Sequence, residues 1–159
     1  MKTLVFILLF CSCTYSQEKL LNSAYVELLG SGGLYSFNYE RMINEQNSFR
    51  IGVSYVDFSH TLIDMKYTSF PVLINQFFFS PRNQIEISGG VIVVAKYSAS
   101  NFNTSNGFYR DVNLINGATY IGYRDWSEES KTIFRIGCSQ LFNQNGVLIS
   151  GGLSLGYLF

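Results

Sequence analysis

The fold is decided by the last fourteen residues of the chain, which read Gly146-Val147-Leu148-Ile149-Ser150-Gly151-Gly152-Leu153-Ser154-Leu155-Gly156-Tyr157-Leu158-Phe159. Large apolar side chains share one parity and end at Tyr157 and Phe159, while the other parity is mostly Ser and Gly. Side chains of a β-strand point alternately to its two faces. This stretch therefore predicts a strand with one bulky apolar face and one face of small residues.

The same alternation recurs upstream, as at Phe49 and Ile51, in segments separated by clusters of Gly, Asn, Ser and Asp. These separators predict eight strands, at residues 23–29, 34–43, 48–58, 65–79, 84–97, 111–126, 131–142 and 147–159. Two places are ambiguous. Residues 24–43 could instead form one long strand bent at its glycines, and in the sixth strand Leu114 and Ile115 fall on opposite faces.

The composition limits the kind of protein this is. Hydrophobic residues make up 47% of the chain and charged residues 14%, whereas a soluble domain carries about 25% charged residues. The 11 basic residues balance the 11 acidic ones, so the chain has no net field that would attract nucleic acid. We therefore expect no nucleic-acid partner, and either an unusually large core or an apolar surrounding.

The N-terminus has the parts of a secretory signal peptide. Lys2 precedes an apolar run at residues 4–10, which is too short to span a bilayer as a helix, and small or polar residues follow it. The pattern predicts cleavage after a signal peptide at residues 1–16, which leaves 17–159 as a single domain. Lipid attachment at Cys13 is the alternative.

After such cleavage Cys138 is the one cysteine that remains, which excludes a disulfide framework and a metal site built on cysteines. The segment Gly30-Ser31-Gly32-Gly33 lacks the lysine and the helix that follow a phosphate-binding loop, so we interpret it as a tight turn or strand kink. We therefore expect no cofactor and no metal.

The polarity of the two strand faces distinguishes a water-soluble barrel from a membrane barrel. In a water-soluble barrel the bulky apolar residues point inward, whereas a membrane barrel carries them on the outside around a polar interior. Here the second face is rich in Gly and Ser and has few charges, so it would make a poor water-facing surface. We predict an all-β protein, an eight-stranded antiparallel up-and-down transmembrane β-barrel. A soluble periplasmic barrel that binds an apolar ligand inside is the alternative.

The chain also resembles a known family. A terminal aromatic residue that shares its parity with other apolar residues is similar to the C-terminal signature that the insertion machinery of outer-membrane barrels recognises; here it would comprise Leu153, Leu155, Tyr157 and Phe159. In length and alternation the chain resembles small eight-stranded barrels of the OmpA/OmpX type. Three phrases are similar to Bacteroidetes barrels that mostly lack an assigned function: residues 27–30, 34–41 and 121–124. The resemblance implies an outer-membrane location, with membrane lipid and the insertion machinery as partners.

Charges on the inward parity are the strongest candidate site. The alternation places six of them in the lumen: Glu40, Arg50, Glu86, Lys96, Arg124 and Arg135. Because isolated charges in a narrow interior are costly, we expect Glu40 and Glu86 to contact the arginines. The network could fill and fix the barrel, or its pairs could exchange partners and gate a pore. An interior of eight strands is just wide enough for side chains, which favours filling.

No catalytic motif stands out. His60 is the single histidine, and Ser59, Asp57 and Asp64 lie near it, so a lipid-modifying enzyme on the same barrel is an alternative. Adjacent Ser and His side chains generally point apart, however. We therefore expect a monomeric, non-enzymatic protein with a structural or surface-interaction role, whose loop at 98–110 could contact a surface ligand.

Overall fold

The computed structural model describes residues 22–60, 63–79, 82–100, 114–127 and 129–159, without the side chains of 58–60, 63–65 and 96–100. These residues form eight β-strands: β1 Asn22–Leu28, β2 Tyr35–Met42, β3 Asn47–His60, β4 Ile63–Phe79, β5 Asn83–Ser100, β6 Ile115–Ser127, β7 Thr132–Asn143 and β8 Gly146–Leu158. The described residues include no helix long and apolar enough to cross a bilayer.

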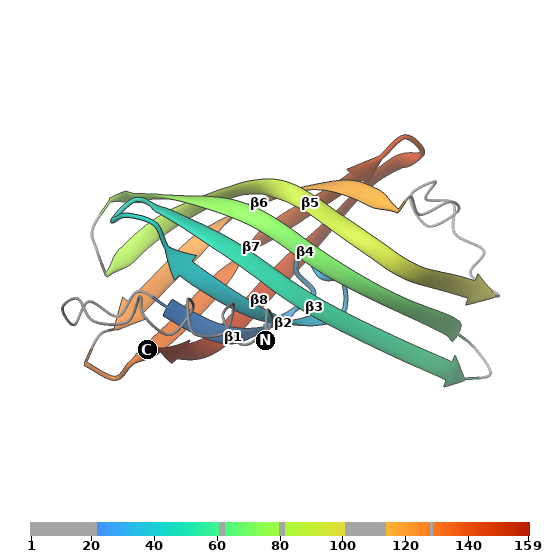
Figure 1. The fold of residues 1–159 in the computed structure, drawn as a ribbon, viewed down its shortest axis with the longest axis horizontal. Coiled ribbons are helices and arrows are strands. Elements are labelled where there is room, and N and C mark those ends of the chain that lie inside the picture. Colours follow the sequence, from blue (N-terminus) through green and yellow to red (C-terminus); the bar gives the residue numbers. More distant parts are fainter. Residues whose placement is uncertain (1–21, 61–62, 80–81, 101–113, 128) are drawn as a thin grey trace, which may run out of the picture.

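Each strand pairs antiparallel with its neighbour in the chain, and β8 pairs with β1, so the sheet closes into an up-and-down barrel (Figure 1). Main-chain hydrogen bonds at the chain end complete this closure. Phe159 and Asn22 exchange two main-chain hydrogen bonds, at 2.9 and 3.1 Å. Since β1 begins and β8 ends on the same side, we call this side the terminal end and the other the loop end. The loop end carries the connections β1–β2, β3–β4, β5–β6 and β7–β8.

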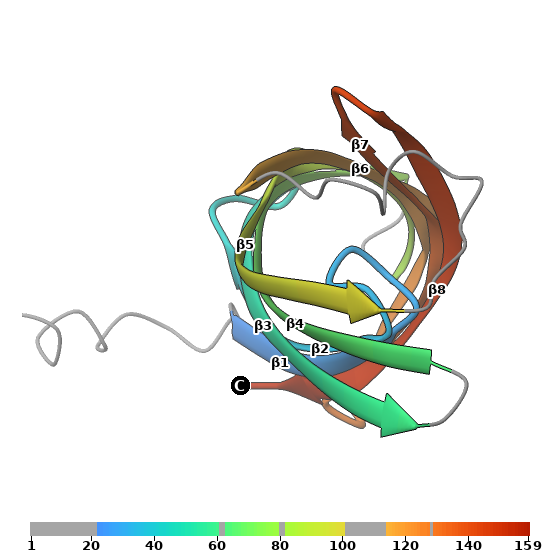
Figure 2. The same ribbon diagram turned by 90° about the vertical axis from the view of Figure 1, so that its right-hand side faces the viewer.

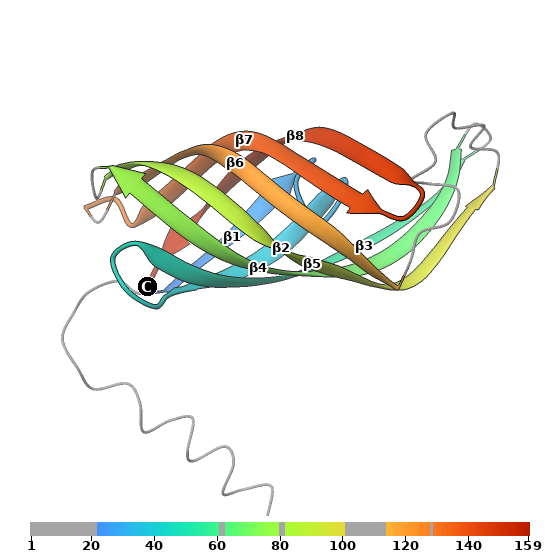
Figure 3. The same cartoon turned by 90° about the horizontal axis from the view of Figure 1, so that it is seen from above.

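The strands differ greatly in length. β1 and β2 have seven and eight residues, whereas β4 and β5 have 17 and 18. As a result β3, β4 and β5 extend past the other strands at the loop end (Figure 3). In β5 one extra residue interrupts the ladder opposite Thr68 and Ser69, as in a β-bulge, and bulges increase the local bend of a strand.

The short β1–β2 connection, residues 29–34, turns into the lumen (Figure 2). Gly33 has φ 97°, a conformation that favours glycine, and a Cβ built there would lie 2.1 Å from the Tyr67 hydroxyl. That hydroxyl accepts a hydrogen bond from the Leu34 N–H at 2.7 Å, and the Ser69 hydroxyl donates to the Gly32 carbonyl at 3.2 Å. The glycine-rich turn therefore packs against the inner wall of β4.

The two faces of the barrel wall have the polarity that a membrane barrel requires. Bulky apolar side chains are exposed on the outside of every strand, for example Phe37, Ile121 and Leu155. The interior is mainly polar at its centre. Two small apolar clusters lie inside as well: Leu73, Ile92, Ala118 and Leu141 form one, and Tyr25, Ile133 and Leu158 the other. The soluble alternative, in which an apolar interior holds a ligand, does not fit this arrangement.

The eight predicted strands are confirmed, with ends that differ by a few residues. Residues 24–43 form a hairpin and not one long bent strand, since Ala24 pairs with Tyr39 and Leu28 with Tyr35. β6 begins later than the expected residue 111, at Ile115. Leu114 precedes the strand, and its carbonyl accepts a hydrogen bond from the Val94 N–H. Its conflicting parity therefore belongs to the connection and not to the strand.

Candidate functional site: the charged layer inside the barrel

Three arginines and three glutamates meet inside the barrel, each from a different strand: Glu27 of β1, Glu40 of β2, Arg50 of β3, Glu86 of β5, Arg124 of β6 and Arg135 of β7. Their side chains are at most 1% exposed. Alternation along each strand turns these residues inward, because the residues beside them in sequence point to the outer face. The layer is electrically balanced, which a buried group of charges requires.

The first pair joins opposite parts of the sheet. Arg124 Nη1 lies 2.7 Å from Glu40 Oε1, although the two residues are 84 positions apart. Glu40 also accepts hydrogen bonds from the Ser48 hydroxyl at 2.8 Å and the Tyr25 hydroxyl at 3.1 Å. The carboxylate is therefore satisfied by one cation and two neutral donors.

The second pair is bidentate. Arg135 Nε donates to Glu86 Oε2 at 2.8 Å, and Arg135 Nη2 donates to Glu86 Oε1. The Ser88 hydroxyl adds a hydrogen bond to Glu86 at 2.9 Å. Parallel contacts of this kind fix the orientation of both groups as well as their distance.

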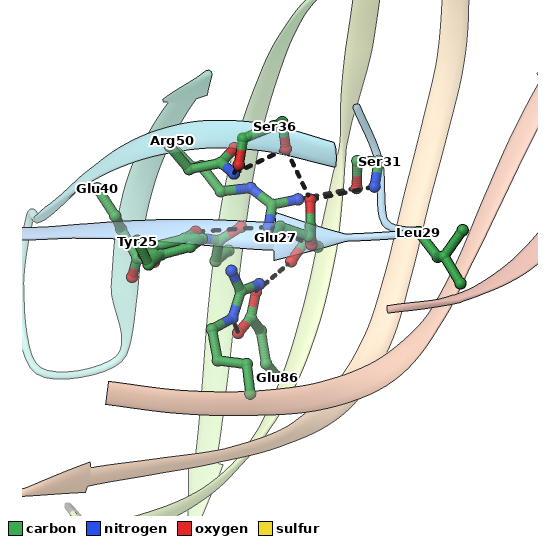
Figure 4. Close-up of polar contacts among 12 residues, drawn as sticks. Tyr25, Glu27, Leu29, Ser31, Ser36, Glu40, Arg50 and Glu86 are labelled. Atoms are coloured by element: carbon green, nitrogen blue, oxygen red, sulfur yellow. Dashed lines mark hydrogen bonds and ion pairs between the residues drawn. The ribbon is translucent and has the colours of Figure 1, made fainter. Parts of the chain in front are cut away.

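The third pair connects the charged layer to the inward β1–β2 turn (Figure 4). Arg50 Nη1 lies 3.4 Å from Glu27 Oε1, and Arg50 Nη2 donates to the Ser31 hydroxyl at 2.9 Å. Glu27 in turn accepts from the Ser31 N–H at 3.1 Å and from the Ser36 hydroxyl at 3.4 Å. Arg50 and Glu27 thus hold Ser31 between them.

Aromatic rings cover the guanidinium groups. The Cζ atom of Arg124 lies 4.3 Å from the ring centres of both Phe77 and Trp126. Arg135 lies 4.8 Å from the Tyr25 ring and 5.0 Å from the Tyr120 ring. A cation over an aromatic face is attracted by the ring quadrupole, more strongly where water is excluded. Each of these two arginines is therefore held by a carboxylate and by two rings.

The contacts expected for Glu40 and Glu86 are present, with Arg124 and Arg135 respectively. Arg50 pairs with Glu27, which the candidate set did not include. Arg50 is the register partner of Glu40, yet no direct hydrogen bond is found between these two described side chains, and the Tyr25 hydroxyl contacts both. Alternation alone could have identified Glu27, because it lies between the outward Val26 and Leu28.

The sixth candidate charge, Lys96, lies on β5, but its side chain is outside the described part of the structure. The same holds for the side chains of His60, Ser59 and Asp64, so the enzymatic alternative stays a prediction without geometry. Asp57, the remaining member of that group, forms an ion pair with Lys66 at 2.7 Å.

Residues 101–113, most of the predicted 98–110 loop, lie outside the described residues, as do 1–16 with the predicted cleavage site. The described residues contain no group of three or more His, Cys, Asp or Glu that could hold a metal ion. The four residues of the expected insertion signal are exposed on the outer face along the second half of β8 and at the residue after it: Leu153, Leu155, Tyr157 and Phe159. Their exposure agrees with the expected parity; their role in insertion stays a prediction.

Topology and polarity together define the class of fold, which is an eight-stranded antiparallel up-and-down β-barrel of the transmembrane type. No protein-family model matches the chain, and no curated protein matches it. A solved structure does match it, the outer membrane protein Ail of Yersinia pestis in a phospholipid bilayer nanodisc. The match has a TM-score of 0.51 and 14% sequence identity, and covers 87% of this chain and 99% of Ail. At this identity the likeness concerns the fold.

Proposed function

We propose that this protein resides in an outer membrane as a filled, non-conducting barrel, and that it has a structural or surface-interaction role without enzymatic activity. One observation carries the proposal. The bulky apolar side chains face outward all around the wall, while Arg50, Arg124 and Arg135 are 0% exposed inside it. This inverted polarity suits a surrounding of acyl chains. The fold shared with Ail, itself described as an outer membrane protein, supports the location.

The filled state rests on the charged layer. Opening a path would require Arg124 and Arg135 to leave both their carboxylates and their aromatic rings. Breaking a buried ion pair leaves an uncompensated charge, and this costs about 3–5 kcal/mol. The layer therefore supports the role of a structural fill over that of a gate whose pairs exchange.

The location is tested by fractionating cells that express the full chain. We expect a band in the detergent-extracted outer membrane that migrates differently before and after boiling, because folded barrels resist denaturation by detergent. Recovery in the soluble periplasmic fraction would refute the proposal.

Closure is tested by reconstituting the purified protein in planar lipid bilayers. A filled lumen predicts no steady conductance for the native protein. Removing two arginines of the charged layer, in the variant R124A/R135A, provides the comparison. Steady, large channels from the native protein would contradict the filled barrel without affecting the location.

A further inference from the structure

The apolar outer face of the barrel has a polar interruption on the neighbouring strands β6 and β7 (Figure 3). Thr119 and Gln140 are register partners there, and both side chains are exposed on the outside of the wall. Exposed apolar side chains lie on both sides of this pair along the two strands: Ile115, Ile121, Ile136 and Phe142. Resting on the proposed membrane location, this arrangement places the Thr119 hydroxyl and the Gln140 amide among acyl chains.

The hydrogen-bonding groups of this pair are not satisfied within the described part of the chain. Neither the Gln140 amide nor the Thr119 hydroxyl has a hydrogen-bond partner among the described residues. A carboxamide has two N–H donors and an acceptor oxygen, so a contact between the two side chains would still leave an N–H unpaired. Acyl chains offer no donor or acceptor, and an unsatisfied polar group among them is costly. The position therefore favours a partner that both donates and accepts.

The surface beside the polar pair allows another surface to come close. Gly89 is the register partner of Thr119 on β5, and Gly151 of β8 is the register partner of Cys138. A Cβ built on Gly89 would have no atom within 4 Å, and one on Gly151 would have only the Gly137 carbonyl oxygen, at 3.9 Å. Small residues permit close approach between proteins in membranes.

We call Gly89, Thr119, Cys138, Gln140 and Gly151 together the amide patch. It carries no charged residue, so two copies of it would not repel each other. Ile149 of β8, the register partner of Gln140, is 67% exposed and provides apolar contact area at its border.

We propose that the amide patch is the contact surface of a homodimer in the plane of the membrane, in which the Gln140 amides of the two copies hydrogen-bond to each other. Copies inserted in the same direction form a closed pair about a two-fold axis along the membrane normal, which brings the same residues together. A carboxamide is complementary to itself under this operation, because it donates through its N–H groups and accepts through its oxygen. The patch thus supplies its own partner, where the sequence led us to expect a monomer.

The tilt of the strands agrees with a contact of this kind. Strands of the two copies would cross at about twice the tilt of 35–45° that membrane barrels have. Such a crossing is too steep for a shared main-chain ladder and confines the contact to a compact area. The amide patch is compact, since its members are register partners or lie two residues apart along a strand.

The dimer is tested by sedimentation equilibrium of the full chain in density-matched detergent micelles. We expect a monomer–dimer equilibrium that Q140L weakens at least about threefold, because one apolar side chain of similar size replaces the amide in each copy. Q140N, which keeps an amide, should retain more of the association than Q140L. A native chain that stays monomeric at every concentration, or a Q140L variant that associates as strongly as the native chain, would overturn the proposal.

A second variant separates association from folding. G151L adds an outward side chain at a position with free space in the single barrel, so the barrel should fold and show the same heat-dependent migration as the native chain. Its dimer should be lost, because the two surfaces are held apart. A folded G151L variant with native association would refute this contact surface.

The same contact is tested in cell membranes with a short, membrane-permeant bifunctional maleimide. In the variant C11S/C13S, Cys138 is the single cysteine of the full chain. We expect a cross-linked dimer that is lost when Q140L is added. The control C11S/C13S/C138S/F37C moves the cysteine to the exposed position 37 on β2, across the barrel from the patch, and should not cross-link. Cross-linking unaffected by Q140L, or equal from position 37, would contradict the proposal.

Failure of the dimer and failure of the proposed location are distinguishable. A monomer found in the outer-membrane fraction would overturn the dimer alone, whereas recovery of the chain in the soluble periplasmic fraction would refute both.

Discussion

Single residues inside the barrel are held by more than one kind of contact. The guanidinium group of Arg135 forms a bidentate pair with Glu86 and contacts the rings of Tyr25 and Tyr120. The pair is inaccessible to solvent, so neither charge can be compensated by water if the other is removed. Arg82 is different, since it is 69% exposed and lies 3.7 Å from Asp125.

At this scale we predict that R135M lowers the free energy of unfolding by about 3–5 kcal/mol, because Glu86 is left buried and unpaired. The double variant R135M/E86L should recover much of the loss, since it removes both charges. R82M should cost less than about 1 kcal/mol. The measurement is urea unfolding in lipid vesicles, followed by the fluorescence of the single tryptophan, Trp126. Equal losses in R135M and R82M would contradict a buried, coupled pair.

At the scale of the strands, β4 and β5 approach each other closely at one glycine and not at its neighbour. A Cβ built on Gly90 would lie 2.1 Å from the Val72 carbonyl oxygen, whereas one on Gly89 has no atom within 4 Å. Both residues are paired in the same ladder, with Leu73 and Ile74 respectively. The two positions therefore share a backbone environment and differ in the space beside them.

We predict that G90A destabilises the barrel by about 1–3 kcal/mol, because the ladder must shift to admit the methyl group. G89A should change stability by no more than about 0.5 kcal/mol. The same unfolding assay measures both. If G89A proved as costly as G90A, the close approach of these strands would be wrong.

The alternation of side chains along the strands predicted which residues point inward, but not the contacts that they make. It placed Glu40, Arg50, Glu86, Arg124 and Arg135 inside, because a side chain on a strand has only two faces to choose from. It could not supply the partners, since Glu40 and Arg124 meet only when the sheet closes. Nor could it predict that the β1–β2 turn enters the lumen, which depends on contacts with β4 that are far away in the sequence.

At the scale of the whole molecule, the outer face distinguishes lipid from water. Ile121 is 56% exposed on β6, and Ile43 is 66% exposed in the turn after β2 at the terminal end. In water, replacing either exposed isoleucine with lysine would cost little. In a bilayer the cost depends on depth, and it is largest near the midplane.

We therefore predict that I121K lowers stability in lipid vesicles by about 2–4 kcal/mol and I43K by about 0–1 kcal/mol. The difference should appear in the free energies of unfolding measured in the same vesicles. Similar values for the two variants would place Ile121 outside the acyl region and contradict the proposed surrounding.

The sequence by itself determined the strands and the direction of their side chains, because the two-residue period of a β-strand ties each face to the local order of residues. It also indicated that the face rich in Gly and Ser, with few charges, would make a poor water-facing surface. Tertiary structure decided the pairing of Glu27 with Arg50, the contacts of arginines with aromatic rings, and the short β1 and β2, beside which β3 continues past Val53 without a described partner on that side. These features depend on distances between strands remote in sequence, which exist only once the barrel has closed.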